Sequence, residues 1–427
     1  MNLTKQFFKY VSQNILGMIG FSCYVLADSY FISIAKGADG LTALNLVMPL
    51  YSIIFSIGEM IGVGSAIRYA ISKIKKDADA DDYFWNALIW CIMSSMIFVF
   101  AGIFFSADIM RVLGADEHIV AVGNNYTKIF MCFAPMFMCN YVTNAFVRND
   151  GAPGIAMSAT LFSSLFNIVF DYILMFPMNL GMEGAALATA LSPIIGMGIC
   201  SIHFFSKKSS VRLVVCKPSV RKLVAGSQLG VSAFVGEMSS AVITLAFNFV
   251  ILKLAGNVGV AAYGVVANIA IVTTAVFNGV AQGSQPLISS CFGRGDRDGC
   301  TQLKRMGYIT AFVLAAVMYS ILFIFAGQFV AVFNSEGSEM LRLYATEGVK
   351  LYFIGIFFAG INIVGGGAFS ATEDAFKAAV VSVARGFVLI LGAVFVMSAL
   401  FGMTGVWLAY AVAEGITTFI MLVMVLR

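Results

Sequence analysis

Long apolar stretches alternate with short polar segments along the whole chain. Each stretch approaches or exceeds about 20 residues, the length that an α-helix needs to cross the hydrocarbon core of a bilayer. The runs are continuously apolar, whereas the strands of a membrane barrel alternate over about ten residues. The pattern therefore predicts twelve membrane-spanning helices, approximately over residues 7–35, 40–72, 83–106, 119–147, 152–176, 181–206, 219–253, 258–291, 303–333, 341–372, 375–400 and 403–426.

The first apolar stretch follows Lys5 and Lys9, so a cleaved signal peptide is the alternative to a membrane helix. A signal peptide has a short apolar core and a cleavage site between small residues. Here the apolar run continues past Ala27 into Asp28 and Tyr30 without a convincing site of that kind. We therefore expect the first helix to be retained.

The composition supports an integral membrane protein. Hydrophobic residues make up 60% of the chain and charged residues only 11%, whereas soluble domains contain about 25% charged residues. Eight scattered cysteines, no C-x-x-C pair and two histidines give little support to a zinc or disulfide framework. The small net charge of +4 requires no nucleic-acid partner. The expected fold class is an all-α polytopic membrane protein without a cofactor.

The distribution of basic residues predicts the orientation in the membrane, because loops rich in Lys and Arg face the cytoplasm. The N-terminus, the even-numbered loops and the C-terminus hold 19 basic residues, Arg148 among them, and the opposite side holds 6. Both termini are therefore expected to be cytoplasmic in a multi-pass protein of the cell membrane (the inner membrane in a cell with two). The longest basic loop, around residues 206–222, divides the chain into an N-lobe (1–206), a cytoplasmic linker (207–218) and a C-lobe (219–427).

The two halves also resemble each other. The segment LGMEGAALATA at 180–190 corresponds to FGMTGVWLAYA at 401–411, an offset of 221. The pairs Ala-Phe at 145 and 368 and Gly-Ser at 64 and 283 follow with offsets of 223 and 219. Generic packing of small residues could explain one such island, but not three in register. We therefore expect two pseudo-symmetric six-helix bundles, with substrate bound between them near the middle of the membrane.

Ionisable residues within predicted spans are functional candidates, because an unpaired charge is costly in a bilayer. Asn167 and Asp171 are four residues apart and share a helix face, and Thr189 lies in the next span. With Asp28 they offer oxygen donors of the kind that sodium prefers. The same carboxylates could instead take up a proton. For Asp28 and Asp171 the alternative is a helix end that is solvated at the membrane surface.

Four further charged residues lie within the predicted spans. Glu59 and Glu414 are candidates for substrate binding or for a second coupling site, with a simple bridge to neighbouring helices as the alternative. Glu237, inside the seventh span, is a candidate for transport. Arg385 could pair with any of the acids.

Two motifs of other protein classes are absent or incomplete. DADADD at 77–82 begins like a calcium loop, but it lacks the glycine at the sixth position and the glutamate at the twelfth. There is no G-x-x-x-x-G-K-[ST] sequence, so we expect no ATP hydrolysis by this chain.

Three segments resemble the multidrug and toxic compound extrusion (MATE) family. They are ADSYFISIAKGADGLTALNLVMPLYSIIFSIGEMIGVGSA (27–66), RNDGAPGIAMSATLFSSLFNIVFDYILMFPMNLGMEGAALATA (148–190) and AAYGVVANIAIVTTAVFNGVAQGSQPLISSCFGRGD (261–296). The resemblance covers nearly the whole chain in order. It implies twelve helices and an exporter of small organic, mainly cationic, molecules that antiports them against H+ or Na+.

The DinF-like branch of that family binds its coupling cation with an Asp, Asn, Asp and Thr cluster in the N-lobe. By resemblance this cluster falls on Asp28, Asn167, Asp171 and Thr189, and Na+ is the only metal it implies. Glu237 resembles a seventh-helix glutamate of other branches. A proline near the start of the first helix is often present in the family, and ILGMIG (15–20) stands in its place here. This difference calls into question a mechanism that needs a proline-driven bend of that helix.

Alternating access is the expected mechanism, with a cavity rich in aromatic and methionine side chains between the lobes. A lipid-linked precursor flippase is the alternative, although a phosphate-bearing substrate favours more basic residues in the cavity than the spans supply. An enzyme is not expected, because His118 and His203 lie in a loop and near a helix end and no catalytic set is apparent. We expect a monomer in the lipid bilayer, with no catalytic residue.

Overall fold

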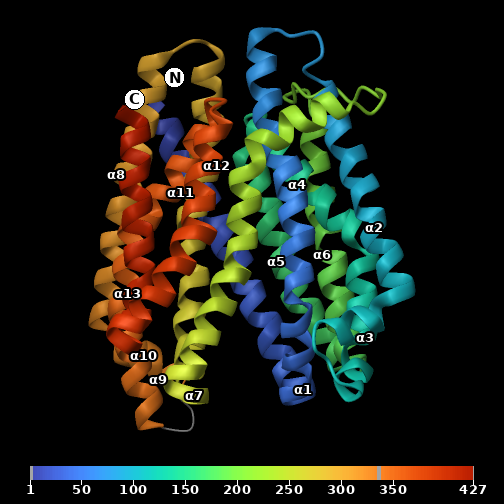
Figure 1. The fold of residues 1–427 in the computed structure, drawn as a ribbon. Helices are drawn as coiled ribbons and strands as arrows, with labels where there is room; N and C mark the ends of the chain where they lie inside the picture. The colour runs from blue at the N-terminus through green and yellow to red at the C-terminus, as the bar shows by residue number, and fades with distance from the viewer. Residues whose placement is uncertain (1–2, 334–337, 427) are drawn as a thin grey trace.

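The computed structural model describes residues 3–333 and 338–426, and this part of the chain contains helices and turns but no strand. Figure 1 shows the helices running side by side along one common direction. Their bounds are α1 Leu3–Lys75, α2 Asp82–Val112, α3 Glu117–Cys132, α4 Ala134–Asn149, α5 Pro153–Met175, α6 Gly181–Phe204, α7 Val220–Gly293, α8 Arg297–Ile324, α9 Ala326–Phe333, α10 Glu339–Tyr352, η1 Phe353–Gly355, α11 Ile356–Ala371, α12 Ala375–Val383, η2 Ala384–Val388 and α13 Leu389–Leu426.

Several of these helices are longer than one crossing of the membrane. Within the described ranges, nine helices are long and apolar enough to span a bilayer, or ten if the bent pair α3–α4 is one span. The 74 residues of α7 would extend about 110 Å as a straight helix, against about 30 Å of hydrocarbon. Breaks at Gly256 in α7 and Gly402 in α13 divide each of these helices into two spans. The count then reaches the expected twelve, which supports the predicted fold class.

Tight turns in the left-handed region join the spans, and they repeat between the two halves of the chain. Such positive φ angles suit glycine because it has no Cβ. Four paired positions occur, at Gly37, Lys76, Gly151 and Gly181 in the first half and at Gly256, Gly295, Glu373 and Gly402 in the second. Gly114 and Asn179 also have positive φ, without a paired position among the described residues. The four pairs are offset by 219, 219, 222 and 221 positions. The backbone thus repeats with the offsets that the sequence islands predicted.

Polar side chains determine where several helices begin. Asp116, Ser219, Asp296 and Asp374 each accept a hydrogen bond from a backbone N–H of the first turn that follows, which satisfies donors that a helix start leaves free.

The predicted spans are correct within a few residues, with two larger differences. Helix α2 continues to Val112 and α8 begins at Arg297, because polar helix ends extend beyond the apolar runs that marked the spans.

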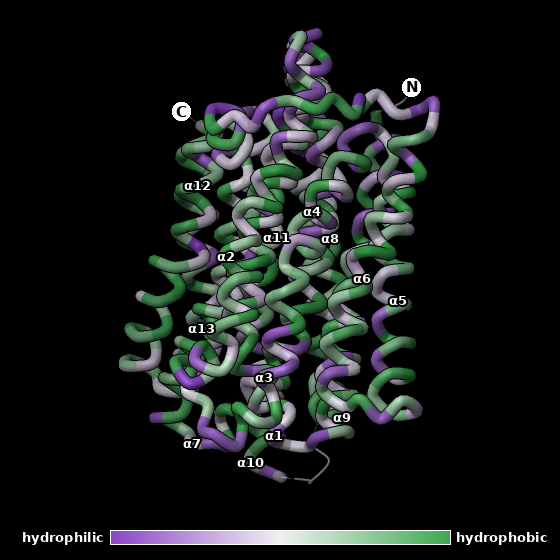
Figure 2. The backbone as a smooth tube through the Cα atoms, turned by 90° about the vertical axis from the view of Figure 1, so that its right-hand side faces the viewer, coloured by the Kyte–Doolittle hydropathy of each residue, from purple (hydrophilic) through white to green (hydrophobic). Residues whose placement is uncertain are grey.

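Buried apolar residues form two large clusters, one in each half of the molecule. The cluster of the N-lobe (the first six spans) and the cluster of the C-lobe (the last six) are almost separate in sequence. Phe7 and Val11 at the start of α1 are exceptions that pack into the C-lobe cluster, and Leu229 of α7 packs into the N-lobe cluster. Figure 2 shows hydrophobic positions along the middle of the helices and hydrophilic positions gathered at both ends of the bundle.

The lobes are in tight contact in the half of the molecule nearer to the chain termini and the linker, here called the linker side (Figure 1). A Cβ at Gly230 of α7 would overlap the backbone of Met60 in α1, and a Cβ at Gly64 would overlap the backbone of Gly226. On the neighbouring contact, a Cβ at Gly283 would lie 2.7 Å from the Cα atom of Val11. Glycine thus permits helices of opposite lobes to touch through their backbones.

The linker between the lobes is bound to the N-lobe. The buried carboxylate of Asp150 accepts hydrogen bonds from the backbone N–H of Ser210 (2.9 Å) and the hydroxyl of Ser209 (2.9 Å), and it pairs with His203 Nε2 at 2.8 Å. Asn86 of α2 accepts from the backbone N–H of Ser219 at 2.6 Å. The predicted linker is therefore an ordered segment packed on one lobe.

Candidate functional site

The predicted N-lobe cluster is assembled in the structure from three helices. Asn167 and Asp171 lie on one face of α5, and Thr189 faces them from α6. In the orientation that satisfies both ends of the Asn167 amide, its NH2 group donates to Asp171 Oδ2 (3.1 Å) and its oxygen accepts from the Thr189 hydroxyl (3.2 Å). All three side chains are buried, with exposed fractions of 0% or 1%. The helix-end alternative for Asp171 therefore does not hold.

Asp28 completes the cluster from α1. It is 6% exposed, and its carboxyl group lies near enough to Asp171 for the two to interact electrostatically. One oxygen of each, Asp28 Oδ1 and Asp171 Oδ1, has no hydrogen-bond partner. Among the ion pairs of the described residues, none involves either acid. Two buried carboxyl groups without a cation require a bound cation or protons to be stable.

The donor set limits what the cluster can hold. It consists of two carboxyl groups, one amide and one hydroxyl, all oxygen donors of the type that hard cations bind. No group of three or more His, Cys, Asp or Glu side chains suited to a metal occurs in the described ranges. Two carboxyl groups with two neutral oxygens can hold a hard cation such as Na+, or a proton on a carboxyl group.

A cavity lies next to this cluster, on the inner face of the N-lobe. Its empty space is about 980 Å³, including the part that is open to solvent. Tyr24, one helical turn before Asp28, lines the cavity and interacts electrostatically with both acids of the cluster. Aromatic side chains contribute much of the apolar wall, including Phe21, Phe55, Phe137 and Tyr141.

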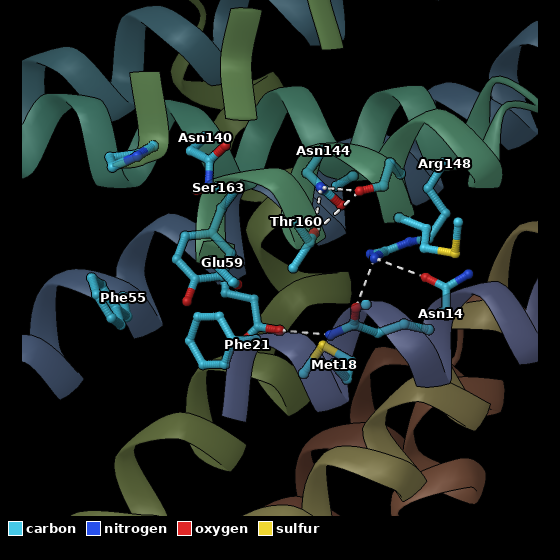
Figure 3. A pocket seen from close by; sticks show the side chains of 18 of the residues that line it. Asn14, Met18, Phe21, Phe55, Glu59, Asn140, Asn144, Arg148, Thr160 and Ser163 are labelled. Carbon is cyan, nitrogen blue, oxygen red and sulfur yellow. Dashed lines mark hydrogen bonds between the residues drawn. The ribbon is translucent and has the colours of Figure 1, made fainter. Parts of the chain in front are cut away.

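A chain of polar side chains crosses this central cavity from one lobe to the other (Figure 3). Arg148 Nη1 of α4 donates to Gln282 Oε1 of α7 at 2.7 Å, and it reaches Asn14 Oδ1 of α1 at 3.4 Å. The amide nitrogen of Gln282 donates to Glu59 Oε1 at 3.2 Å. Because Gln282 belongs to the C-lobe and the other three to the N-lobe, this chain connects the lobes.

A second cavity of about 570 Å³, also counted with its open part, continues into the C-lobe. Glu59, Val63, Glu237 and Gln282 line both cavities and so mark the boundary between them. The structure thus places the two candidate glutamates of the sequence, Glu59 and Glu237, together at the lobe interface. They do not join the Asp28 cluster.

Arg385 and Glu414 form an ion pair in the C-lobe, and Arg385 also lines the second cavity. Arg385 lies in the π-helical turn η2, and its Nη2 donates to Glu414 Oε1 at 2.7 Å. Asn362 of α11 donates to Glu414 Oε2 at 2.7 Å and to the Glu414 backbone oxygen at 2.9 Å. The alternatives that the sequence left open for Arg385 reduce to Glu414, and Glu414 links three spans.

Sequence reasoning missed the role of Arg148 and its neighbours. Arg148 was counted among the loop charges of the linker side, but its side chain turns back into the cavity and is only 4% exposed. Removing it from the count leaves the predicted orientation unchanged. The spacing of Asn140, Asn144 and Arg148, four residues apart on one helix face, was a signal that the sequence contained. The contact with Gln282 had no such signal, because it joins helices of different lobes.

This chain is similar to known proteins in both sequence and structure. The MatE family model matches residues 14–173 and 233–397. The multidrug export protein MepA of Staphylococcus aureus (strain MRSA252) is 27% identical over 405 residues, which cover 92% of this chain and 87% of MepA. A solved structure described as the outward-facing conformation of a multidrug resistance MATE family transporter of the MOP superfamily is 20% identical, with a TM-score of 0.92 over 99% of this chain and 95% of that one.

A second structural neighbour shows how far the fold alone can be used. It is a MOP superfamily transporter from Pyrococcus furiosus, 19% identical, with a TM-score of 0.91 over 99% of this chain and 95% of that one. It is described as a transporter in which the reverse polarity of the binding pocket suggests a different function. A shared fold therefore does not by itself determine the function. The family model, in contrast, matches more than half of this sequence. The chain belongs to the MatE family.

Proposed function

We propose that this protein exports small organic molecules, mainly cations, and that it antiports them against Na+ or H+ bound at Asp28, Asn167, Asp171 and Thr189. The names of its relatives, a multidrug export protein and a multidrug resistance transporter, support export rather than catalysis. The observation that carries the coupling site is the unsatisfied oxygen on each of two buried acids, Asp28 and Asp171, beside the central cavity.

The proposed cycle is alternating access between the N-lobe (1–206) and the C-lobe (219–427). The glycine contacts bring the lobes together on the linker side, so this structure corresponds to a state that is closed there. We assign the linker side, with both termini, to the cytoplasm of a cell membrane protein because of its excess of basic residues. A cation that enters from outside would favour one state only through different affinities for the two states.

The cavity supports a cationic substrate. Glu59 and Glu237 both line it, and aromatic faces such as those of Phe21 and Phe55 attract cations as well as apolar groups. Tyr24 stands between this cavity and Asp28, so a change at the cation cluster is one residue away from the substrate. We propose that binding of the coupling ion displaces substrate through this contact.

The test uses protein reconstituted in liposomes that contain a cationic dye, the methyl ester of rhodamine 110. A sodium gradient and a pH gradient are imposed separately, and Asp171→Asn is measured beside the wild type. Dye movement that follows one gradient and falls to background in the variant supports the proposal, and the active gradient identifies the ion. The substitution is nearly isosteric, so the variant is expected to bind the dye as the wild type does.

A lipid-linked precursor flippase is the competing function. If neither gradient moves the dye, while a labelled lipid-linked precursor crosses the same liposomes, the exporter assignment is wrong and the flippase takes its place. Transport that persists unchanged in Asp171→Asn would keep the exporter but place the coupling site elsewhere.

A further inference from the structure

Arg148 is a buried cation for which the structure offers no carboxylate at ion-pair distance. It is 4% exposed, and its Nε atom has no hydrogen-bond partner. Among the ion pairs of the described residues, none includes Arg148. Its partners are the neutral side-chain oxygens of Gln282 and Asn14. A guanidinium group can donate five hydrogen bonds in a planar fork, so much of its capacity is unused.

The position of Arg148 makes this capacity available to a ligand. Its side chain lines the central cavity together with Asn14, Asn144 and Gln282, and Figure 3 shows it at one end of the group of lining residues. Burial strengthens the interaction of a charge with a partner that reaches it, and arginine binds carboxylates in a bidentate manner. A carboxylate that enters the cavity would therefore find a group that the protein leaves incompletely paired.

The negative charges of the cavity are held apart from this cation. Glu59 is near enough to Arg148 to interact with it electrostatically. The hydrogen bonds between them run through the amide of Gln282, which accepts from the arginine and donates to the glutamate. Glu237 lines the same cavity from the C-lobe. The cavity thus has a cationic group, Arg148, at one end and the acids Glu59 and Glu237 at one side. The neutral amide of Gln282 lies between Arg148 and Glu59, and a ligand can replace it there.

We propose that Arg148, with Asn14 and Gln282, forms a subsite for the carboxylate of a substrate, so that the preferred substrates are zwitterions. The carboxylate binds at Arg148 in place of the Gln282 oxygen, and the cationic part of the same molecule faces Glu59 and Glu237. The inference rests on the proposed function, because it specifies the substrates that the exporter would take. It differs from a purely cationic site, in which Arg148 would repel the ligand.

A matched pair of dyes tests the subsite. Rhodamine 110 carries a free carboxylate and a cationic ring system, and its methyl ester keeps the ring system but loses the negative charge. Binding of each dye to the purified full chain is measured by fluorescence anisotropy without any ion gradient. The wild type is expected to bind rhodamine 110 about tenfold more tightly than the ester, the effect of one hydrogen-bonded ion pair in a partly wet cavity.

Two variants assign the difference to Arg148. Arg148→Met is expected to bind both dyes with equal affinity, and Arg148→Lys is expected to retain part of the preference, because it keeps the charge without the fork. Gln282→Glu places a carboxylate of the protein on Arg148 and is expected to abolish the preference for rhodamine 110 while the ester still binds. Because Gln282→Glu is nearly isosteric, it provides the test of the subsite if Arg148→Met does not fold.

The control is Gln285→Glu, one turn further along α7, which faces the C-lobe cavity and not Arg148. It is expected to keep the preference for rhodamine 110. Equal binding of the two dyes by the wild type, or a preference that survives both Arg148→Met and Gln282→Glu, would overturn the subsite. Because binding is measured without a gradient, this result leaves the transport experiment and the exporter proposal unaffected.

Discussion

The two lobes repeat the same backbone, but their buried acids differ in whether a cation of the protein lies beside them. In the N-lobe, Asp28 and Asp171 each retain an oxygen without a partner. In the C-lobe, Glu414 is bound by Arg385 at 2.7 Å and by Asn362 at 2.7 Å. The acids are similarly buried, with exposed fractions of 6%, 0% and 2% in the same order. The difference is therefore in the counter-charge and not in the burial.

From this contrast we infer that the Asp28 and Asp171 pair, and not Glu414, can respond to a dissolved cation. A buried carboxylate that has its own guanidinium is already neutralised, and an incoming ion would have to break that pair. A pair of acids without a cation depends on the solution for its counter-charge, so its state changes with the ion concentration or the pH. Glu414 of the C-lobe thus has its own counter-charge in Arg385, whereas Asp28 and Asp171 form no ion pair with any described residue.

The largest effect is expected when the N-lobe is given its own cation. Asn167→Lys would place an ammonium group beside Asp171 and Asp28, as Arg385 stands beside Glu414. Gradient-driven transport of the cationic dye should fall about ten- to hundredfold, the range of typical coupling between sites, while dye binding persists. Proteoliposome transport under both gradients measures the first quantity, and fluorescence anisotropy measures the second.

Asn167→Leu serves as the control for that variant, because it removes the same amide without adding a charge. It should weaken coupling less than the lysine does, since both acids remain free to bind the ion. If Asn167→Lys still follows either gradient at the rate of the wild type, the exchangeable counter-charge is not the basis of coupling.

The second effect is on stability and belongs to the C-lobe. Glu414→Gln leaves Arg385 as an uncompensated buried charge, so the free energy of unfolding should fall by about 3–5 kcal/mol. The double variant Glu414→Gln with Arg385→Gln should recover most of this loss, because neither charge remains. Thermal unfolding in detergent measures both variants. The folded double variant should still show gradient-driven transport; loss of coupling in a stable double variant would instead assign the C-lobe pair a direct part in ion coupling.

Much of the fold could be predicted from the sequence, because a bilayer imposes a simple rule on the chain. Apolar runs of sufficient length must be helices, so the twelve spans follow from composition alone. The offset of about 220 residues between sequence islands recurs in the positive-φ turns, such as Gly37 and Gly256. The breaks near Phe133 and at Phe353–Gly355 were not predicted, because the apolar pattern continues across them.

The candidate site was predictable only where its residues are near one another in sequence. Asn167 and Asp171 share a face through their spacing, and the resemblance to the MATE family supplied Asp28 and Thr189. The choice of Glu414 as the partner of Arg385 could not be read from the sequence, because several buried acids were available. Arg148 was assigned to a loop because the predicted fourth span ends at residue 147, and only packing shows that its side chain turns inward.

A third, smaller effect is expected at a turn where the lobes differ. Gly151 in the N-lobe and Glu373 in the C-lobe occupy equivalent turns and both have positive φ, 86° and 61°. A glutamate is strained in this conformation. Its carboxylate forms an ion pair with Arg68 of the other lobe, near Lys75 at 3.6 Å. Glu373→Gly should relieve the strain, break this pair and favour separation of the lobes on the linker side by about 1 kcal/mol at most.

Spin labels at Ala78 and Asp298, both exposed on the linker side, measure the separation of the lobes in each variant. Asp374→Asn is the matched control, because Asp374 pairs only with Lys377 of the same lobe, at 3.2 Å. A longer label distance in Glu373→Gly but not in Asp374→Asn is expected. Equal distances in all three proteins would show that this ion pair does not hold the lobes together.

The smallest effect concerns His118, whose titration could produce a pH dependence that is not caused by protons at Asp28 and Asp171. His118 Nε2 lies 2.9 Å from Asp39 Oδ2 on the surface opposite the linker, and the two side chains are 68% and 53% exposed. A histidine has an ordinary pKa of about 6.5, so the ion pair is present at low pH and is lost as the pH rises and the ring becomes neutral. Compared with His118→Gln, the wild type should therefore unfold at a slightly higher temperature at pH 5.5 and at the same temperature at pH 8.5.

Transport separates this surface pair from the buried acids. His203 is the other histidine of the chain, and it is bound to Asp150 on the linker side. In the proposed orientation, His118 is therefore the histidine exposed to an outer pH change. If protons act at Asp28 and Asp171, His118→Gln should leave transport under a pH gradient unchanged. A variant that keeps the sodium response but loses the pH response would instead place proton sensing at the surface, and the contrast between the lobes would then apply to sodium alone.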